Sequence, residues 1–183
     1  KNASVVASAR GVNVPFWLAY KPARVKLPAR IHRGMVDLDA TALVLQGKVA
    51  DYHAQVALSD GAVSSEKLGR PVSGLSALLE VSPDAAVARD VRVTVGKLAL
   101  AGEATLVGLE KNPTLRGRLR TGPIEEADVR ELVPGLPALP DVRLGRVENL
   151  EVHFAGTPDD PGILWWLEWA RGKLGPWKPP AGR

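Results

Sequence analysis

Residues that could support chemistry are few in this chain, and they are scattered. The three histidines, His32, His53 and His153, lie far apart and do not have a metal-ligand spacing such as H-x-x-x-H. The 183 residues include no cysteine, which excludes disulfides and thiolate chemistry. The sequence also lacks a G-x-S-x-G nucleophile motif, a phosphate loop and a dinucleotide-binding fingerprint. We therefore expect no enzyme, no cofactor and no metal site.

Asp37 and Asp39 form a pair of carboxylates whose spacing could still do chemistry. Two residues apart on a strand, they point to the same face, where they could bind a cation or act as an acid and base. Because no third ligand is nearby, a solvated strand face is the preferred interpretation. Arg116, Arg118 and Arg120 share this spacing and have no aromatic neighbours, so they do not indicate a nucleic-acid surface. The same solvated arginines explain the net charge of +4.

The elements that must position these residues are predicted by a period of two in the apolar residues, which is typical of β-strands with one buried face. Turn residues separate the strands, notably Ser59-Asp60-Gly61 and Glu110-Lys111-Asn112-Pro113. Gly96 and Gly102 are expected inside strands, as bulges or sites of close packing. The predicted strands are Ser4–Ala9, Ala29–Val49, Tyr52–Leu58, Val72–Val81, the stretch Asp90–Leu106, Leu115–Arg120 and Val142–Phe154.

A short helix is predicted at Ile124–Val133, where the apolar residues change to helical spacing. Glu125 and Glu126 stand in its first turn, where the helix dipole favours negative charge, and Pro134 ends it. Two or three turns are not stable alone. We expect this helix to dock on an apolar surface, most simply the end of the sheet.

The tail differs from the rest because its stretch Ile163–Leu174 carries three of the five tryptophans. Trp165, Trp166 and Trp169 stand beside Arg171 and Lys173, the composition of a helix that lies at a membrane interface. A helix packed over the open end of the sheet is an equal alternative. In either case we expect a helix at Ile163–Leu174, too short to span a bilayer.

Several motifs follow one another between residues 35 and 155. A G-L-x-A-x-L strand begins at Gly74, a strand with small and apolar residues spans Val95–Gly102, and a P-x-L-x-G-x-L-type strand spans Pro113–Arg120. A short helix with the D-x-x-x-L-x-P pattern follows at Asp128–Pro134. This series resembles the repeat of the AsmA-like superfamily, which includes AsmA, YhdP and TamB.

The resemblance implies a non-enzymatic piece of a bridge-like lipid transport protein of a bacterial cell envelope. The protein would be periplasmic and membrane-associated, and it would bind phospholipid or another acyl-chain lipid. It would take part in outer-membrane biogenesis and could contact other envelope proteins. Because the chain begins at Lys1, we interpret it as a processed product or part of a longer protein.

The sequence thus predicts a mainly β protein: an elongated, twisted antiparallel sheet curled into an open trough, with a short helix and a C-terminal helix. We divide it into an N-terminal edge strand or connector (1–30), a meander ending in the helix (31–134), the start of a following β unit (135–160) and the Trp-rich, basic C-terminal helix and tail (161–183). A structural or scaffolding domain is the alternative, in which the same residues pack a dry core. The residues expected to line the trough, open to water, are Leu98, Leu100, Ala104, Leu106, Leu115 and Leu119.

Overall fold

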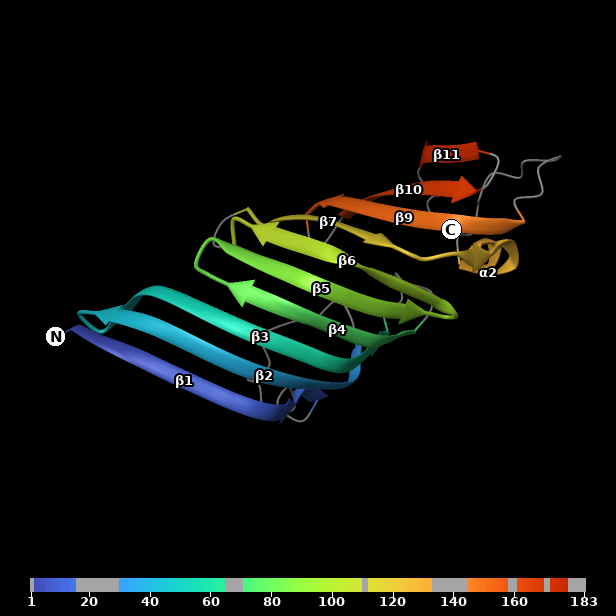
Figure 1. Ribbon diagram of the computed structural model, residues 1–183. Coiled ribbons are helices and arrows are strands. Elements are labelled where there is room, and N and C mark those ends of the chain that lie inside the picture. The colour runs from blue at the N-terminus through green and yellow to red at the C-terminus, as the bar shows by residue number, and fades with distance from the viewer. Residues whose placement is uncertain are drawn as a thin grey trace.

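The computed structural model describes residues 2–15, 30–64, 71–109, 112–132, 145–157, 161–169 and 172–177. These residues form one antiparallel sheet in the order β1-β2-β3-β4-β5-β6-β7-β9-β10-β11, while β8 pairs with β9 beside this path (Figure 1). The sheet twists and does not close on itself, which confirms the predicted open antiparallel sheet. The strands are β1 (Asn2–Asn13), β2 (Arg30–Leu45), β3 (Lys48–Ser64), β4 (Val72–Val81), β5 (Ala85–Val95), β6 (Leu98–Val107), β7 (Thr114–Arg120), β8 (Ile124–Glu125), β9 (Arg146–Gly156), β10 (Pro161–Trp169) and β11 (Gly172–Trp177).

Two predicted strands are each divided by a tight turn. Gln46 and Gly47 join β2 to β3 with φ angles of 54° and 79°. Left-handed conformations at both central residues suit the two-residue turns that match the twist of a hairpin. Gly96, with φ 61°, makes the corresponding turn between β5 and β6, so the expectation that it lies inside a strand is wrong. The sequence pattern concealed both turns because apolar alternation resumes immediately after them.

The predicted turn at Ser59-Asp60-Gly61 is wrong, because β3 continues through it. Asp60 adopts a left-handed conformation, φ 51°, and the pairing of β3 with β4 shifts register between Leu58 and Gly61. This is a β-bulge, which bends a strand and increases its twist. Comparable register shifts fall near Gly11 in β1, Gly34 in β2, Gly74 in β4 and Asp90 in β5. Bulges therefore cross five neighbouring strands and bend this half of the sheet.

Two glycines allow β6, β7 and β9 to approach closely. A Cβ atom at Gly102 would overlap the main-chain carbonyl of Arg118 on β7. A Cβ atom at Gly117 would overlap the ring of Phe154 on β9. The prediction of close packing at Gly102 is confirmed.

The helix α2 (Glu126–Leu132) confirms the predicted short helix, although Ile124 and Glu125 form β8 instead of its first turn. Val129 is fully buried, so α2 docks on the sheet as its length requires. Figure 1 shows it beside the beginning of β9. Asp128 forms an ion pair with Lys97 at 3.8 Å, at the turn that precedes β6.

The predicted C-terminal helix at Ile163–Leu174 is wrong. This segment forms β10 and β11, which pair as a hairpin and continue the sheet beyond β9. The register places Leu167 opposite Leu150, and both side chains are buried. Pairing with an exposed edge and burial of Leu167 outweigh a helical periodicity that is only about three turns long. Gly172, inside the segment, also disfavours a continuous helix.

Several predicted elements extend beyond the described residues. They include the first two residues of the turn that begins at Glu110, the end of the predicted helix at Val133 and Pro134, and the first residues of the predicted strand Val142–Phe154. In the described part of the chain, β7 pairs directly with β9, so the strand that follows α2 extends the same sheet.

Candidate functional site

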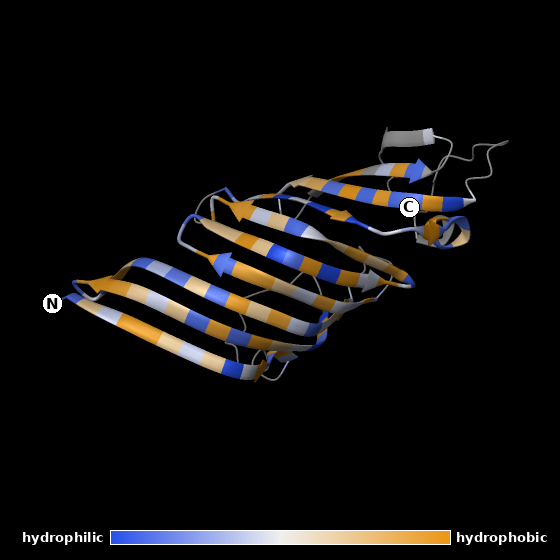
Figure 2. Ribbon diagram, in the orientation of Figure 1, coloured by the Kyte–Doolittle hydropathy of each residue, from blue (hydrophilic) through white to orange (hydrophobic). Residues whose placement is uncertain are grey.

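One face of the sheet is apolar along its whole width. Residues paired directly across antiparallel strands point to the same face, so the register assigns every strand's alternate residues to one side. Figure 2 shows the resulting alternation of hydrophobic and hydrophilic residues along the strands. The apolar face is formed by Ala3, Val5, Ala7 and Ala9 (β1), Val36, Leu38, Ala40, Ala42 and Val44 (β2), Tyr52, Ala54, Val56 and Leu58 (β3), Leu75, Ala77, Leu79 and Val81 (β4), Ala86, Ala88, Val91, Val93 and Val95 (β5), Leu98, Leu100, Ala104 and Leu106 (β6), Leu115 and Leu119 (β7), Leu150, Val152 and Phe154 (β9) and Ile163 and Leu167 (β10).

The apolar face has a packed end, where α2 docks and where β6 and β9 begin. Leu98 is 2% exposed and Leu100 is 6% exposed. Leu100 belongs to a cluster with Val72 and Val93, against which Leu119 packs while partly buried. At this end the sheet has a dry hydrophobic core.

The other end of the apolar face, where β6 ends and where β2 turns into β3, is its open end. Leu106 and Leu115 face each other across β6 and β7 and are half-buried. On other strands at this end, Val49 and Ile163 are 62% and 37% exposed. Ala104, one pair nearer the middle, is half-buried as well.

The six predicted trough residues are therefore divided between the two ends. Ala104, Leu106 and Leu115 lie on the open part of the face, whereas Leu98 and Leu100 lie in the core and Leu119 packs against it while partly buried. The expectation that Leu100 is open to water is wrong, because its side chain packs with Val72 and Val93 on the neighbouring strands. The predicted trough lining did not include the open apolar residues of β1, β2 and β3. Their strict alternation with polar residues was the signal that could have identified them.

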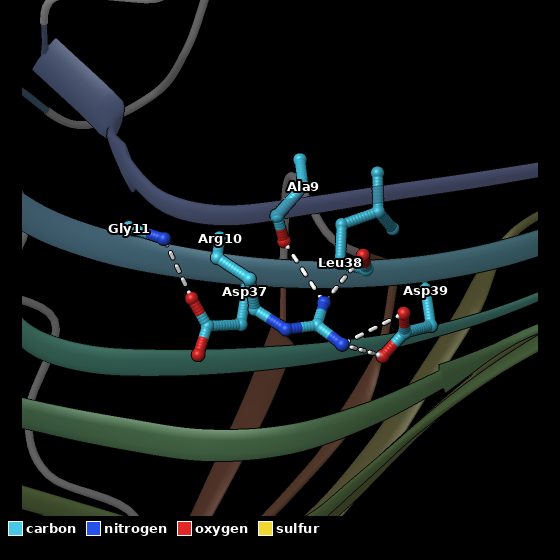
Figure 3. Close-up of polar contacts among 6 residues, drawn as sticks. All are labelled: Ala9, Arg10, Gly11, Asp37, Leu38 and Asp39. Atoms are coloured by element: carbon cyan, nitrogen blue, oxygen red, sulfur yellow. Dashed lines mark hydrogen bonds and ion pairs between the residues drawn. The ribbon is translucent and has the colours of Figure 1, made fainter.

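Asp37 and Asp39 lie on the opposite, polar face and are engaged in joining β1 to β2 (Figure 3). Arg10 donates to both Asp39 carboxylate oxygens, at 2.9 and 2.7 Å, and to the Leu38 carbonyl at 2.9 Å. The Asp39 hydrogen bond and charge raise the pKa of Arg10 above its ordinary value. Asp37 accepts the Gly11 N–H at 2.7 Å, at the bulge of β1. Both carboxylates thus have a structural role.

Other charged groups of the polar face also pair near the surface. Arg89 contacts Glu80 at 3.1 Å and Arg118 contacts Glu103 at 3.4 Å. Arg116, Arg118 and Glu103, with Thr105 and His153, line a shallow hollow over β6, β7 and β9, an arrangement that the sequence did not predict. Since its walls are mostly exposed strand side chains, this hollow has no buried group that could select a ligand.

His32 and His153 are likewise engaged in local contacts. His32 Nε2 lies 2.6 Å from Ser64 Oγ, and His153 Nε2 lies 2.9 Å from Glu151 Oε1. The His153 ring also contacts Trp166, with ring centroids 4.1 Å apart. Across the described residues, no three His, Cys, Asp or Glu side chains come together in a way that could hold a metal ion.

The predicted membrane-interface residues are not presented by a helix. Trp165, Trp166 and Trp169 belong to β10, and Lys173 of β11 is paired with Glu168. Arg171 lies outside the described residues. A strand places consecutive residues on alternate faces, so the hairpin does not form the amphipathic helical surface that was expected. None of the described helices has the length and apolarity needed to cross a membrane.

The fold and face define a single-layered, open antiparallel sheet with one apolar side. No family model, curated protein or solved structure matches the chain. The likeness to the AsmA-like repeat stays a prediction from the motifs.

Proposed function

We propose that this chain is a non-enzymatic lipid-binding module whose open apolar end shields acyl chains from water. The observation that carries the proposal is the part of the apolar face around Leu106 and Leu115 that no described element covers, and which continues onto β1, β2 and β3. Removing a methylene group from water contributes about 0.8 kcal/mol, so an extended chain lying on such a surface would be held without any specific polar contact. Apolar patches of this extent on soluble proteins commonly mark interaction sites.

The polar face supports the same function from the other side. Its ion pairs, such as Arg89–Glu80 and Arg118–Glu103, are solvated and keep that side of the sheet in water. A lipid would then lie on one face only, with its headgroup at the rim. The AsmA-like motifs suggest phospholipid as the ligand, and lipid transfer in a bacterial envelope, near membranes and with other envelope proteins, as the setting.

A scaffolding domain is the second candidate, and the packed end favours it. Leu98, Leu100, Leu150 and Leu167 are buried there by protein alone, as in the core of a structural domain. On this proposal the open end is covered by protein and not by lipid.

Lipid extraction of the purified chain, followed by native mass spectrometry with added phospholipid, separates the two candidates. We expect bound phospholipid, and we expect Leu106→Glu to lower its occupancy at least ~fivefold because a carboxylate interrupts the strip of apolar surface. Val107→Glu is the matched control: the neighbouring residue on the polar face, 44% exposed, should tolerate the same change without loss of lipid.

Each outcome is decisive if both variants retain the β-sheet spectrum in circular dichroism. No bound phospholipid in the wild-type chain overturns the lipid proposal. Equal occupancy in Leu106→Glu and Val107→Glu removes the open end from the site.

A further inference from the structure

The two edges of the sheet differ in how well they are protected against pairing. Edge strands expose free N–H and C=O groups, and proteins usually block them with charges, proline, bulges or short length. Strand β11 spans six residues and contains Pro176, which has no N–H. Strand β1 spans twelve residues, and its stretch from Asn2 to Ala9 contains neither charge nor proline. Of the two edge strands described, β1 is therefore better able than β11 to pair with a further strand.

The one charged side chain of β1, Arg10, does not guard this edge. It reaches inward to Asp39 and to the Leu38 carbonyl on β2. The remaining side chains up to that point are small or β-branched and almost uniformly exposed. Within β1 from Asn2 to Ala9, no charged side chain and no proline opposes an incoming strand before the bulge at Gly11.

The sequence of β1 complements itself when read in the opposite direction. If two copies pair antiparallel about Val6, Ser4 lies opposite Ser8 and Ala3 lies opposite Ala9. Moving the centre to either neighbour, Val5 or Ala7, places serine against valine instead. Facing hydroxyls hydrogen-bond and facing valines pack, which are favourable cross-strand pairs.

Val6 is otherwise hard to explain. It stands on the polar face, opposite Thr41, and is 76% exposed, more than any other large apolar side chain described here. In the self-paired arrangement it would pack against Val6 of the second copy at the twofold axis.

We propose that β1 is a self-association edge, through which two copies of this chain join antiparallel about Val6. A twofold axis normal to the sheet keeps equivalent faces on the same side. The two apolar faces then form one surface, with Val5 and Ala7 at its centre. This inference goes beyond the lipid proposal and does not depend on it, since the pairing holds for a scaffold as well.

Sedimentation and light scattering over about 1 to 100 µM test the association. We expect a dimer, and we expect Val6→Lys to raise its dissociation constant at least ~tenfold, since it places two ammonium groups directly opposite each other. Val107→Lys makes the same change on the polar face far from β1 and should leave the dimer intact. A monomer throughout this range overturns the proposal, as does a dimer indifferent to Val6→Lys.

Cysteine cross-linking tests the register independently of stability. The sequence contains no cysteine, so a single introduced thiol gives an unambiguous product. Val6→Cys should form a disulfide-linked dimer, because facing Cα atoms lie about 4.5 to 5.5 Å apart. Ser4→Cys alone should not, because its copy is displaced by four residues, roughly 13 Å. A mixture of Ser4→Cys and Ser8→Cys should cross-link. Efficient cross-linking of Ser4→Cys with itself contradicts the register.

Discussion

Individual residues of the apolar face have different roles according to where they lie along the strands. Leu100 and Leu106 belong to one strand and one face, six residues apart, yet Leu100 is in the core and Leu106 is half-buried. The same substitution should therefore have different consequences at these two positions.

Leu100→Asp should lower the free energy of unfolding by ~4 kcal/mol, because it removes a packed side chain and buries a charge without a partner. For a chain of this size the thermal midpoint should fall by roughly 10 °C. Leu106→Asp should cost less than ~2 kcal/mol, since its carboxylate can reach water. Urea denaturation followed by circular dichroism measures both. An equal loss of unfolding free energy in the two variants would mean that Leu106 is buried in a core like Leu100.

Gly102 is a second position where a small substitution should change stability, here by adding a single Cβ atom. Gly102→Ala should lower the free energy of unfolding by about 1 to 3 kcal/mol, because the new Cβ overlaps the main chain of β7 at Arg118. Gly122→Ala is the matched control, since no atom lies within 4 Å of its added Cβ, and should change stability by less than about 0.5 kcal/mol. Chemical denaturation of the two variants is sufficient, and similar midpoints would contradict the close approach of β6 and β7.

Among the elements, β10 is the one whose type was decided by its neighbour. Trp, Leu and Glu accept helix or strand, and the local pattern at Ile163–Leu174 suited a helix. The edge of β9 offers unpaired backbone groups together with Leu150 and Val152, and pairing satisfies both at once. A helix at this position would leave that edge exposed.

The strand assignment of β10 predicts unequal roles for two leucines. A helix packed on the sheet would place Leu164 and Leu167 on one face, whereas a strand separates them. Leu167→Ala should cost about 2 to 5 kcal/mol, because this side chain is fully buried opposite Leu150. Leu164→Ala, opposite His153 on the polar face, should cost ~1 kcal/mol or less. Thermal unfolding of the two variants is the measurement, and equal losses would favour a helix.

At the scale of the whole molecule, the described residues form a single-layered sheet, which is unusual among chains of this length. Most domains pack two layers around one core. Here α2 covers only the packed end, and in the described part of the chain the rest of the apolar face has no second layer. The shape should therefore be extended.

Small-angle scattering can test this shape. A compact domain of this length has a radius of gyration of about 16 Å. We expect a clearly larger value, on the order of 20 Å or more, because an extended single layer spreads the same mass over more length. The measurement should use Val6→Lys, so that pairing through β1 does not contribute to the size. A value near 16 Å would mean that the sheet is covered or closed in solution.

What the sequence determined by itself was the local conformation of most of the chain. Alternation of Val, Leu and Ala with charged residues specifies strands such as β2 and β4, and also which side chains share a face. The helical spacing after Thr121 specified α2. These properties depend on residues two to four positions apart, so they can be read without knowledge of distant partners.

The tertiary structure decided what depends on distant residues. Whether Ser59-Asp60-Gly61 turns or bulges depends on β4 lying alongside β3. Whether residues 161–169 form a helix or a strand depends on the free edge of β9. Whether Leu100 meets water or a core depends on Val72 of β4 and Val93 of β5, which pack against it. Hydrogen-bond pairing and burial are properties of two segments at once, and a local pattern records only one of them.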